Sequence, residues 1–249
     1  MESHESSFVV SFLIVIFAII HSGGAALRSR AEEVIGARMW RIFFVTASLP
    51  SAIILIGYFL SHRYDGIRLW NLQDNHYVFI MVWVLTAISF LFLYPATYNL
   101  LEIPSIKKPQ IRIYSTGIMR ITRHPQAFGQ IIWCLAHTLW IGSSFTLVTS
   151  IGLILHHVFA IWHGDKRLQN KFGVQFDEYR KNTSIIPFLA IFDGRQKLQL
   201  NEFLKLSQVG ILVAIGVIWG AHRYINIAVN TFNSSFLSEF LDWQFNINI

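Results

Sequence analysis

Charged residues are scarce in this sequence, and cysteine is nearly absent. Only 14% of the 249 residues are Asp, Glu, Lys or Arg, against about 25% in soluble domains. The low charge, with 53% hydrophobic residues, excludes an ordinary soluble domain and places the chain among membrane proteins with several spans. The single cysteine, Cys134, excludes an internal disulfide and any CxxC metal site. No cleavable signal pattern and no Arg- and Ser-rich transit peptide is visible at the acidic N-terminus.

Six hydrophobic runs approach the roughly 20 residues that cross a bilayer as a helix. We predict spans at 8–27, 39–61, 77–98, 126–141, 145–162 and 206–224. Only Gly142, Ser143 and Ser144 separate the fourth run from the fifth, so these two form a tight antiparallel hairpin. Segment 164–205 is predicted as an amphipathic loop on the membrane surface, because it mixes charges with apolar residues at helical spacing. The expected fold is an all-α polytopic membrane helix bundle, a single domain over residues 1–249.

The positive charges lie on one side of this predicted topology. The net charge is +6, which could suggest nucleic acid, but the basic residues sit in loops between apolar runs. Of the 20 lysines and arginines, all but Arg63, Arg68 and Arg223 fall in the loops after the first, third and fifth runs. This split follows the positive-inside rule and places those loops on the cytoplasmic or stromal side. It predicts membrane lipid as a partner and argues against nucleic acid.

A polar seam runs along the fourth predicted span. Gln126, Gln130, Cys134 and His137 are spaced by four, four and three residues, so they share one helical face. Polar groups at membrane depth usually face a bundle interior, a cavity or a cofactor. His21 lies in the first span, and two histidines on different helices beside a cysteine favour a metal or haem. For any single histidine, an interhelical hydrogen bond is an equally good interpretation.

A second group of candidate residues precedes the fourth span, in the sequence R-I-T-R-H-P. Pro125 suits the first turn of a helix. Arg120 and Arg123, together with the helix N-terminus, could bind an anion such as a phosphate, a carboxylate or a haem propionate. The alternative interpretation is that both arginines are ordinary flanking charges, and spacing alone slightly favours it.

Several ordered motifs resemble those of one known family. They are H-S-G-G (21–24), S-H-R-Y-D-G (61–66), T-G-I-M-R-I-T-R-H-P-Q (116–126), W-C-L-A-H-T-L-W-I-G (133–142) and T-S-I-I-P-F (183–188). Together they are similar to the 15-cis-ζ-carotene isomerases of plants, algae and cyanobacteria, within a broader group of NnrU-type membrane proteins. The resemblance runs from about residue 21 to about residue 196.

The resemblance implies an integral haem b enzyme of a thylakoid, plastid or cyanobacterial membrane. Such an enzyme converts the 15-cis bond of 9,15,9′-tri-cis-ζ-carotene to trans and gives the 9,9′-di-cis product. The family's two haem-iron ligands match His21 and His137, and Cys134 matches a cysteine linked to ligand exchange. These three are the expected catalytic residues, with Arg120 and Arg123 as further cofactor-binding candidates. An electron donor and other carotenoid-pathway enzymes are the remaining expected partners.

Our mechanistic hypothesis is that iron reduction releases one axial ligand, and that the open position then polarises the 15-cis bond as a Lewis acid. One difficulty is visible in the sequence. His21 lies in the inner half of its span and His137 in the outer half, an offset of roughly 10 Å at 1.5 Å per residue.

Two other classes of function stay open. The R-H-P motif, followed by Tyr179 and Pro187, also resembles the isoprenylcysteine carboxyl methyltransferases, which bind S-adenosylmethionine. Against this interpretation, Asp165 stands where that family is expected to have glutamate, and the methyltransferase fold requires neither His21 nor Cys134. The third class is a non-enzymatic haem protein that transfers electrons or senses nitric oxide.

Overall fold

The computed structural model describes residues 2–98 and 113–203, together with residues 212–213, 215–222, 224, 227 and 231. Over these residues the chain forms helices and turns, and its β pairing is limited to one bridge between Arg68 and Ser143. The predicted all-α class is therefore confirmed for the described part of the chain.

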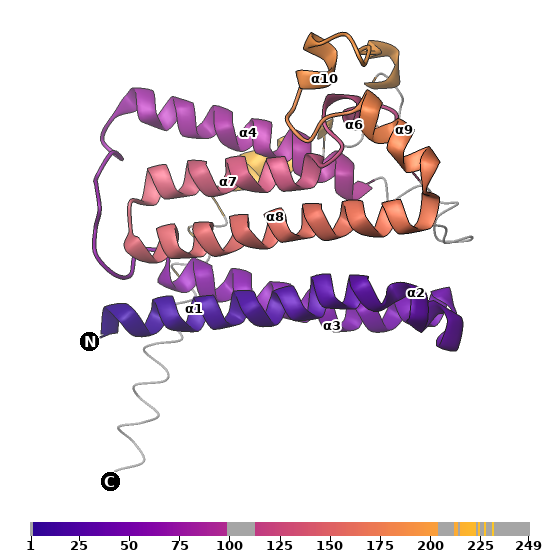
Figure 1. Cartoon of the computed structure of the whole chain (residues 1–249). Helices are drawn as coiled ribbons and strands as arrows, with labels where there is room; N and C mark the ends of the chain where they lie inside the picture. The colour runs from indigo at the N-terminus through magenta and orange to yellow at the C-terminus, as the bar shows by residue number, and fades with distance from the viewer. Residues whose placement is uncertain are drawn as a thin grey trace.

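The first two long helical segments of the bundle, the continuous α1–η1–α2 segment and α3, lie side by side (Figure 1). The first consists of α1 (Glu2–Ala18), the π-helical turn η1 (Ile19–Gly23) and α2 (Gly24–Ile35), which follow one another without a break. Gly36 then adopts φ +80°, a conformation open to glycine because it has no Cβ. The chain reverses there and returns as α3 (Ala37–His62), which packs against both α1 and α2.

Three further long helices complete the bundle. They are α4 (His76–Tyr98), α7 (Pro125–Ile141) and α8 (Ser144–Phe172). In Figure 1, α4 lies against α7, α7 against α8, and α8 against α1. Pro125 is the first residue of α7, as predicted, because a proline at this position loses no helical hydrogen bond.

The turn between α7 and α8 is the predicted tight hairpin. Gly142 ends α7 in the left-handed region at φ +68°, and its N–H bonds the Thr138 carbonyl. Ser143 then caps α8, because its Oγ accepts the N–H of Thr146 at 3.0 Å. The 63–75 loop covers this turn, with the Leu69 N–H donating to the Gly142 carbonyl at 2.7 Å.

Short helices gather at the opposite end of the bundle, near the start of α7 (Figure 1). They are α6 (Ile118–Ile121), α9 (Val174–Asn182), α10 (Leu189–Phe192) and the 3₁₀ turn η3 (Leu200–Phe203). The segment predicted as an amphipathic loop from residue 164 begins later than expected. Helix α8 continues to Phe172 because neither proline nor a left-handed residue interrupts it before Gly173, at φ +51°.

Four described helices are long and apolar enough to cross a membrane. They are Glu5–Ile35, Ala37–His62, His76–Leu93 and Ser144–Phe172, and they correspond to the predicted spans 8–27, 39–61, 77–98 and 145–162. Helix α7 coincides with the predicted 126–141 span but has only 17 residues. The predicted 206–224 span lies partly outside the described residues. The count of six spans is therefore not confirmed, and the predicted sidedness of the loops stays a prediction.

Helices α4 and α7 approach closely at Gly129. The Ser89 hydroxyl donates to the Gly129 carbonyl at 2.8 Å. A Cβ built on Gly129 would meet the Ser89 carbonyl oxygen and the Leu93 backbone nitrogen, both at 2.8 Å. Backbone atoms cannot move aside as a flexible side chain does, so an added methyl group at Gly129 would force α4 and α7 apart.

We therefore expect Gly129→Ala to lower the free energy of unfolding by about 1–3 kcal/mol, the usual effect of overpacking. Thermal unfolding of the purified protein in detergent measures this change. The matched control is Gly57→Ala on α3, where an added Cβ meets nothing within 4 Å. A loss of stability as large in the control as in Gly129→Ala would contradict the close approach.

Candidate active site

A cavity of about 600 Å³ lies between α3, α4 and α7. Its volume is within the usual range for small-molecule sites, which are mostly apolar with few polar groups. Two of its polar side chains are His137 from α7 and His222 from the C-terminal region. The aromatic part of its wall is formed by Phe59, Tyr64, Phe79, Trp83, Trp133 and Trp140.

The imidazole of His137 is held in one orientation. Its Nδ1 donates to the Trp133 carbonyl at 2.9 Å, and its ring stacks on the Trp133 indole at 3.8 Å between centroids. With the proton on Nδ1, the Nε2 lone pair is available, which is the usual arrangement of a metal-ligating histidine. The ring of His222 faces it edge-on, at 5.8 Å between centroids.

His21 lies in different surroundings. It belongs to the π-helical turn η1, and such turns occur often at functional sites. Its ring stacks on Phe17 at 5.1 Å and contacts Phe44 at 5.3 Å and His156 at 6.4 Å. The buried Nδ1 of His156 has no hydrogen-bond partner among the described residues.

The structure does not bring His21 and His137 together as a pair. On α3, His21 contacts Phe44 and His137 contacts Phe59, positions separated by about 22 Å of helix at 1.5 Å per residue. Two axial ligands of one iron place their nitrogens only about 4 Å apart. The imidazole that faces His137 in the structure is that of His222. Among the described residues no group of three or more His, Cys, Asp or Glu side chains could hold a metal ion.

Cys134 lies on the side of α7 that faces α8. Its side chain is fully buried and accepts a hydrogen bond from Gln130 Nε2 at 3.7 Å. Its carbonyl accepts from the Ser150 hydroxyl of α8 at 3.3 Å. The contact with Gln130 confirms that these two members of the seam share a face. Cys134 does not line the cavity that His137 lines.

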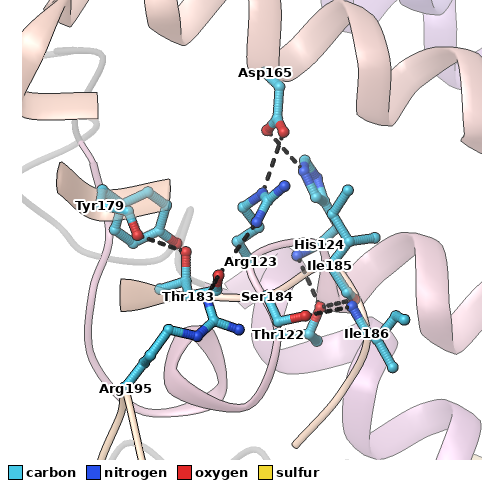
Figure 2. A network of polar contacts seen from close by, with 10 residues as sticks. All are labelled: Thr122, Arg123, His124, Asp165, Tyr179, Thr183, Ser184, Ile185, Ile186 and Arg195. Carbon is cyan, nitrogen blue, oxygen red and sulfur yellow. Dashed lines mark hydrogen bonds and ion pairs between the residues drawn. The ribbon is translucent and has the colours of Figure 1, made fainter. Parts of the chain in front are cut away.

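The R-H-P motif forms a polar network that joins the start of α7 to α8 and to the segment after α9 (Figure 2). Asp165 of α8 accepts from Arg123 Nε at 3.1 Å and from His124 Nε2 at 2.8 Å. The Arg123 N–H donates to the Ser184 carbonyl at 2.9 Å, and its Nη1 to the Thr183 carbonyl at 3.4 Å. The network thereby fixes the start of α7 against α8 and against the segment after α9.

Arg120 is paired in a similar way with a carboxylate of the chain. Its Nε and Nη2 donate to the two oxygens of Glu202, each at 2.8 Å, and its Nη1 donates to Gln196 at 2.8 Å. The hydrogen bonds to Glu202 hold the pKa of Arg120 above its usual range. The anions that Arg120 and Arg123 meet here are thus Glu202 and Asp165, and binding of an external anion by these arginines stays a prediction.

Beside this network lies a second, much smaller cavity of about 80 Å³. Arg123, His124, Asp165 and Tyr179 contribute to its wall, and burial raises the pKa of the Tyr179 hydroxyl. Arg123, His124 and Tyr179 are among the residues on which the methyltransferase interpretation rests, and Asp165 stands where that family is expected to have glutamate. Sites for ligands of drug size usually enclose about 300–1,000 Å³, and the part of this cavity that the described residues enclose is smaller than that. The geometry favours a structural role for the motif.

Residues 9–229 match the NnrU protein family. The chain belongs to this family. It is 50% identical over 213 residues to a maize protein named "15-cis-zeta-carotene isomerase, chloroplastic", a match that covers 84% of this chain and 58% of the relative. An Arabidopsis thaliana protein of the same name is 52% identical over 202 residues, 80% of this chain and 55% of that protein. The chain thus spans little more than half the length of these relatives. No solved structure matches it.

One residue of this NnrU family member was missed in the sequence. His222 follows Trp219 by three residues in the predicted sixth span, so both share a helical face. In the structure the Trp219 indole donates to the Trp83 carbonyl at 3.3 Å, and His222 contacts the Trp83 ring at 6.3 Å. The sequence signal that could have identified His222 is its place in an apolar run, one helical turn after Trp219.

Proposed function

We propose that this NnrU family member is a cis-trans isomerase that converts 9,15,9′-tri-cis-ζ-carotene to its 9,9′-di-cis form in a plastid or cyanobacterial membrane. The observation that carries the proposal is the cavity of about 600 Å³ with an aromatic wall and one oriented histidine. The names of the maize and Arabidopsis relatives support the substrate and the compartment.

The cavity suits a hydrocarbon substrate. A polyene dissolves in the bilayer rather than in water, and the helices around the cavity expose large apolar side chains to their surroundings, among them Ile53, Ile56 and Val84. Inside, the rings of Trp133 and Trp140 offer flat apolar surfaces to a conjugated chain. The polyene can therefore pass from lipid to cavity without exposure to water.

The donor groups at this cavity fit haem b. His137 presents Nε2 to the cavity, and His222 is the second imidazole that faces the same space. When bound, haem supplies an iron that can polarise a double bond or exchange an electron with it. The Trp133 carbonyl keeps the His137 ring in one tautomer, and the aromatic wall keeps water away from the reacting bond.

A ligand exchange between His137 and Cys134 would require movement of α7. Residues three apart on a helix point about 60° from one another. The Cys134 thiol lies beside Ser150 of α8 and does not line the cavity. Rotation of α7 would have to break the 2.7 Å hydrogen bond between Thr138 and Ser150. The exchange hypothesis therefore predicts that α7 shifts against α8 when the iron changes oxidation state.

Filling the cavity should stop the reaction. We expect Val82→Trp, in the cavity wall, to lower isomerisation by at least about tenfold, because differential binding of 1.4 kcal/mol already gives that factor. The measurement is chromatography of carotenoids from bacteria that accumulate the tri-cis substrate in the dark. The matched control is Val84→Trp on the same helix, which is 52% exposed and outside the cavity wall. Equal activity of the two variants at equal expression would place the substrate elsewhere.

A further inference from the structure

A basic pocket of about 530 Å³ lies far from the aromatic cavity, between α2 and the C-terminal end of α8. Ala26 and Ser29 line it from α2. Its charged wall comes from Lys166, Arg167 and Lys171 of α8, and its described lining includes no carboxylate. The Arg167 Nη1 donates to the Ala25 carbonyl at 2.9 Å, which joins the two helices at this point.

Buried guanidinium groups behind this pocket have unused donors. Arg167 Nε and Arg28 Nη2 are both inaccessible to solvent and have no hydrogen-bond partner among the described residues. Arg28 donates its Nε to Glu32 at 2.5 Å, and both side chains lie close enough to Arg167 to interact with its charge. A buried N–H of a charged group costs free energy unless it is hydrogen-bonded. Of the two arginines, Arg167 lines the pocket and adds its positive charge to the wall, and an anion in the pocket would balance that charge.

An apolar stripe leads along α8 to the same pocket. Leu155, Val158, Phe159 and Trp162 follow one another at helical spacing and are all between 51% and 63% exposed, so they form one surface of the helix. Lys166 is the next position on this stripe, and its Nζ lies 5.3 Å from the centre of the Trp162 ring. Tryptophan beside lysine at the end of a span is typical of the level of lipid headgroups.

We propose that this basic pocket binds the phosphate of an anionic glycerophospholipid, with the acyl chains along the Leu155–Trp162 stripe. Basic pockets between spans bind anionic headgroups by charge and by hydrogen bonds from guanidinium groups. The phosphate chemistry alone would suit inorganic phosphate equally. The adjoining apolar stripe favours a lipid over a free anion, because only a lipid has acyl chains that can cover these apolar side chains.

The test is to add phosphatidylglycerol to the purified protein in detergent and to measure the melting temperature of the protein. We expect saturating phosphatidylglycerol to raise the melting temperature by about 5 °C, and phosphatidylcholine to leave it unchanged. The double variant Lys166→Ala/Lys171→Ala should bind phosphatidylglycerol about 30-fold more weakly, from the usual contribution of two basic residues near an anionic lipid. Both lysines are exposed, so their removal should leave the fold intact.

The matched control is Arg180→Ala/Lys181→Ala, which removes two exposed basic residues of α9 outside the pocket. This variant should bind like the wild type. Three results would overturn the assignment: equal affinity of both double variants, equal stabilisation by phosphatidylcholine, or stabilisation by inorganic phosphate as large as that by the lipid. The last result would identify a free anion as the ligand.

Discussion

His137→Ala is expected to abolish both the haem absorbance of the purified protein and the conversion of tri-cis-ζ-carotene. The reason is that His137 is the cavity residue with an oriented imidazole and an available Nε2. Loss of an outer-shell partner alone weakens a metal site about 10–100-fold, so removal of the proposed ligand should lower activity by more than about 100-fold. Absorbance near the haem Soret band and carotenoid chromatography of the same preparation measure the two effects.

The chain offers a matched control for this experiment in His62. Its Nδ1 also lies 3.0 Å from a carbonyl four residues earlier, that of Tyr58, and its ring stacks on the Tyr58 ring at 4.0 Å. His62 does not line the cavity. His62→Ala should therefore retain the haem and the activity. If His137→Ala kept full absorbance while His21→Ala lost it, the iron would belong beside His21 and His156.

Asp165→Asn is expected to cause the largest loss of stability. The Asp165 carboxylate accepts hydrogen bonds from both Arg123 and His124, and the three side chains are only 10–17% exposed. An amide of the same shape removes the charge and leaves Arg123 without its counter-ion. Breaking a buried ion pair in this way costs about 3–5 kcal/mol, or roughly 10 °C in melting temperature for a chain of this size. Thermal unfolding in detergent measures the effect.

The comparison for this variant is Asp193→Asn. Asp193 pairs with Arg195 at 2.6 Å, but both side chains are more than a third exposed. Exposed pairs add little to stability because water and salt screen them. The melting temperature of Asp193→Asn should equal that of the wild type. If Asp165→Asn did so as well, the polar network would not hold α7 against α8.

The sequence was sufficient to predict the elements whose causes are local. The apolar runs gave the long helices, Pro125 marked the start of α7, and the glycine and serines at 142–144 gave the hairpin. The spacing of Gln130 and Cys134 placed them on one face, and the structure confirms their contact.

The partners of the motif residues could not be predicted, because they are distant along the chain. Arg123 and Asp165 are 42 residues apart, and Arg120 and Glu202 are 82 apart. From the sequence, the arginines were interpreted either as an anion site or as ordinary flanking charges, because their own carboxylates were not recognised. Similarly, the sequence indicated that His21 and His137 lie at different depths in their spans. The structure adds that the two histidines contact different residues of α3, Phe44 and Phe59. It also shows that the ring of His222 faces His137.

The most direct test is to incubate purified wild-type protein with 9,15,9′-tri-cis-ζ-carotene in the dark, under conditions that reduce the proposed haem, and to identify the products by chromatography. We expect conversion to the 9,9′-di-cis isomer by the wild type and none by His137→Ala. Unchanged substrate in the presence of a wild-type protein with a full haem spectrum would contradict this expectation and leave a haem protein without isomerase activity.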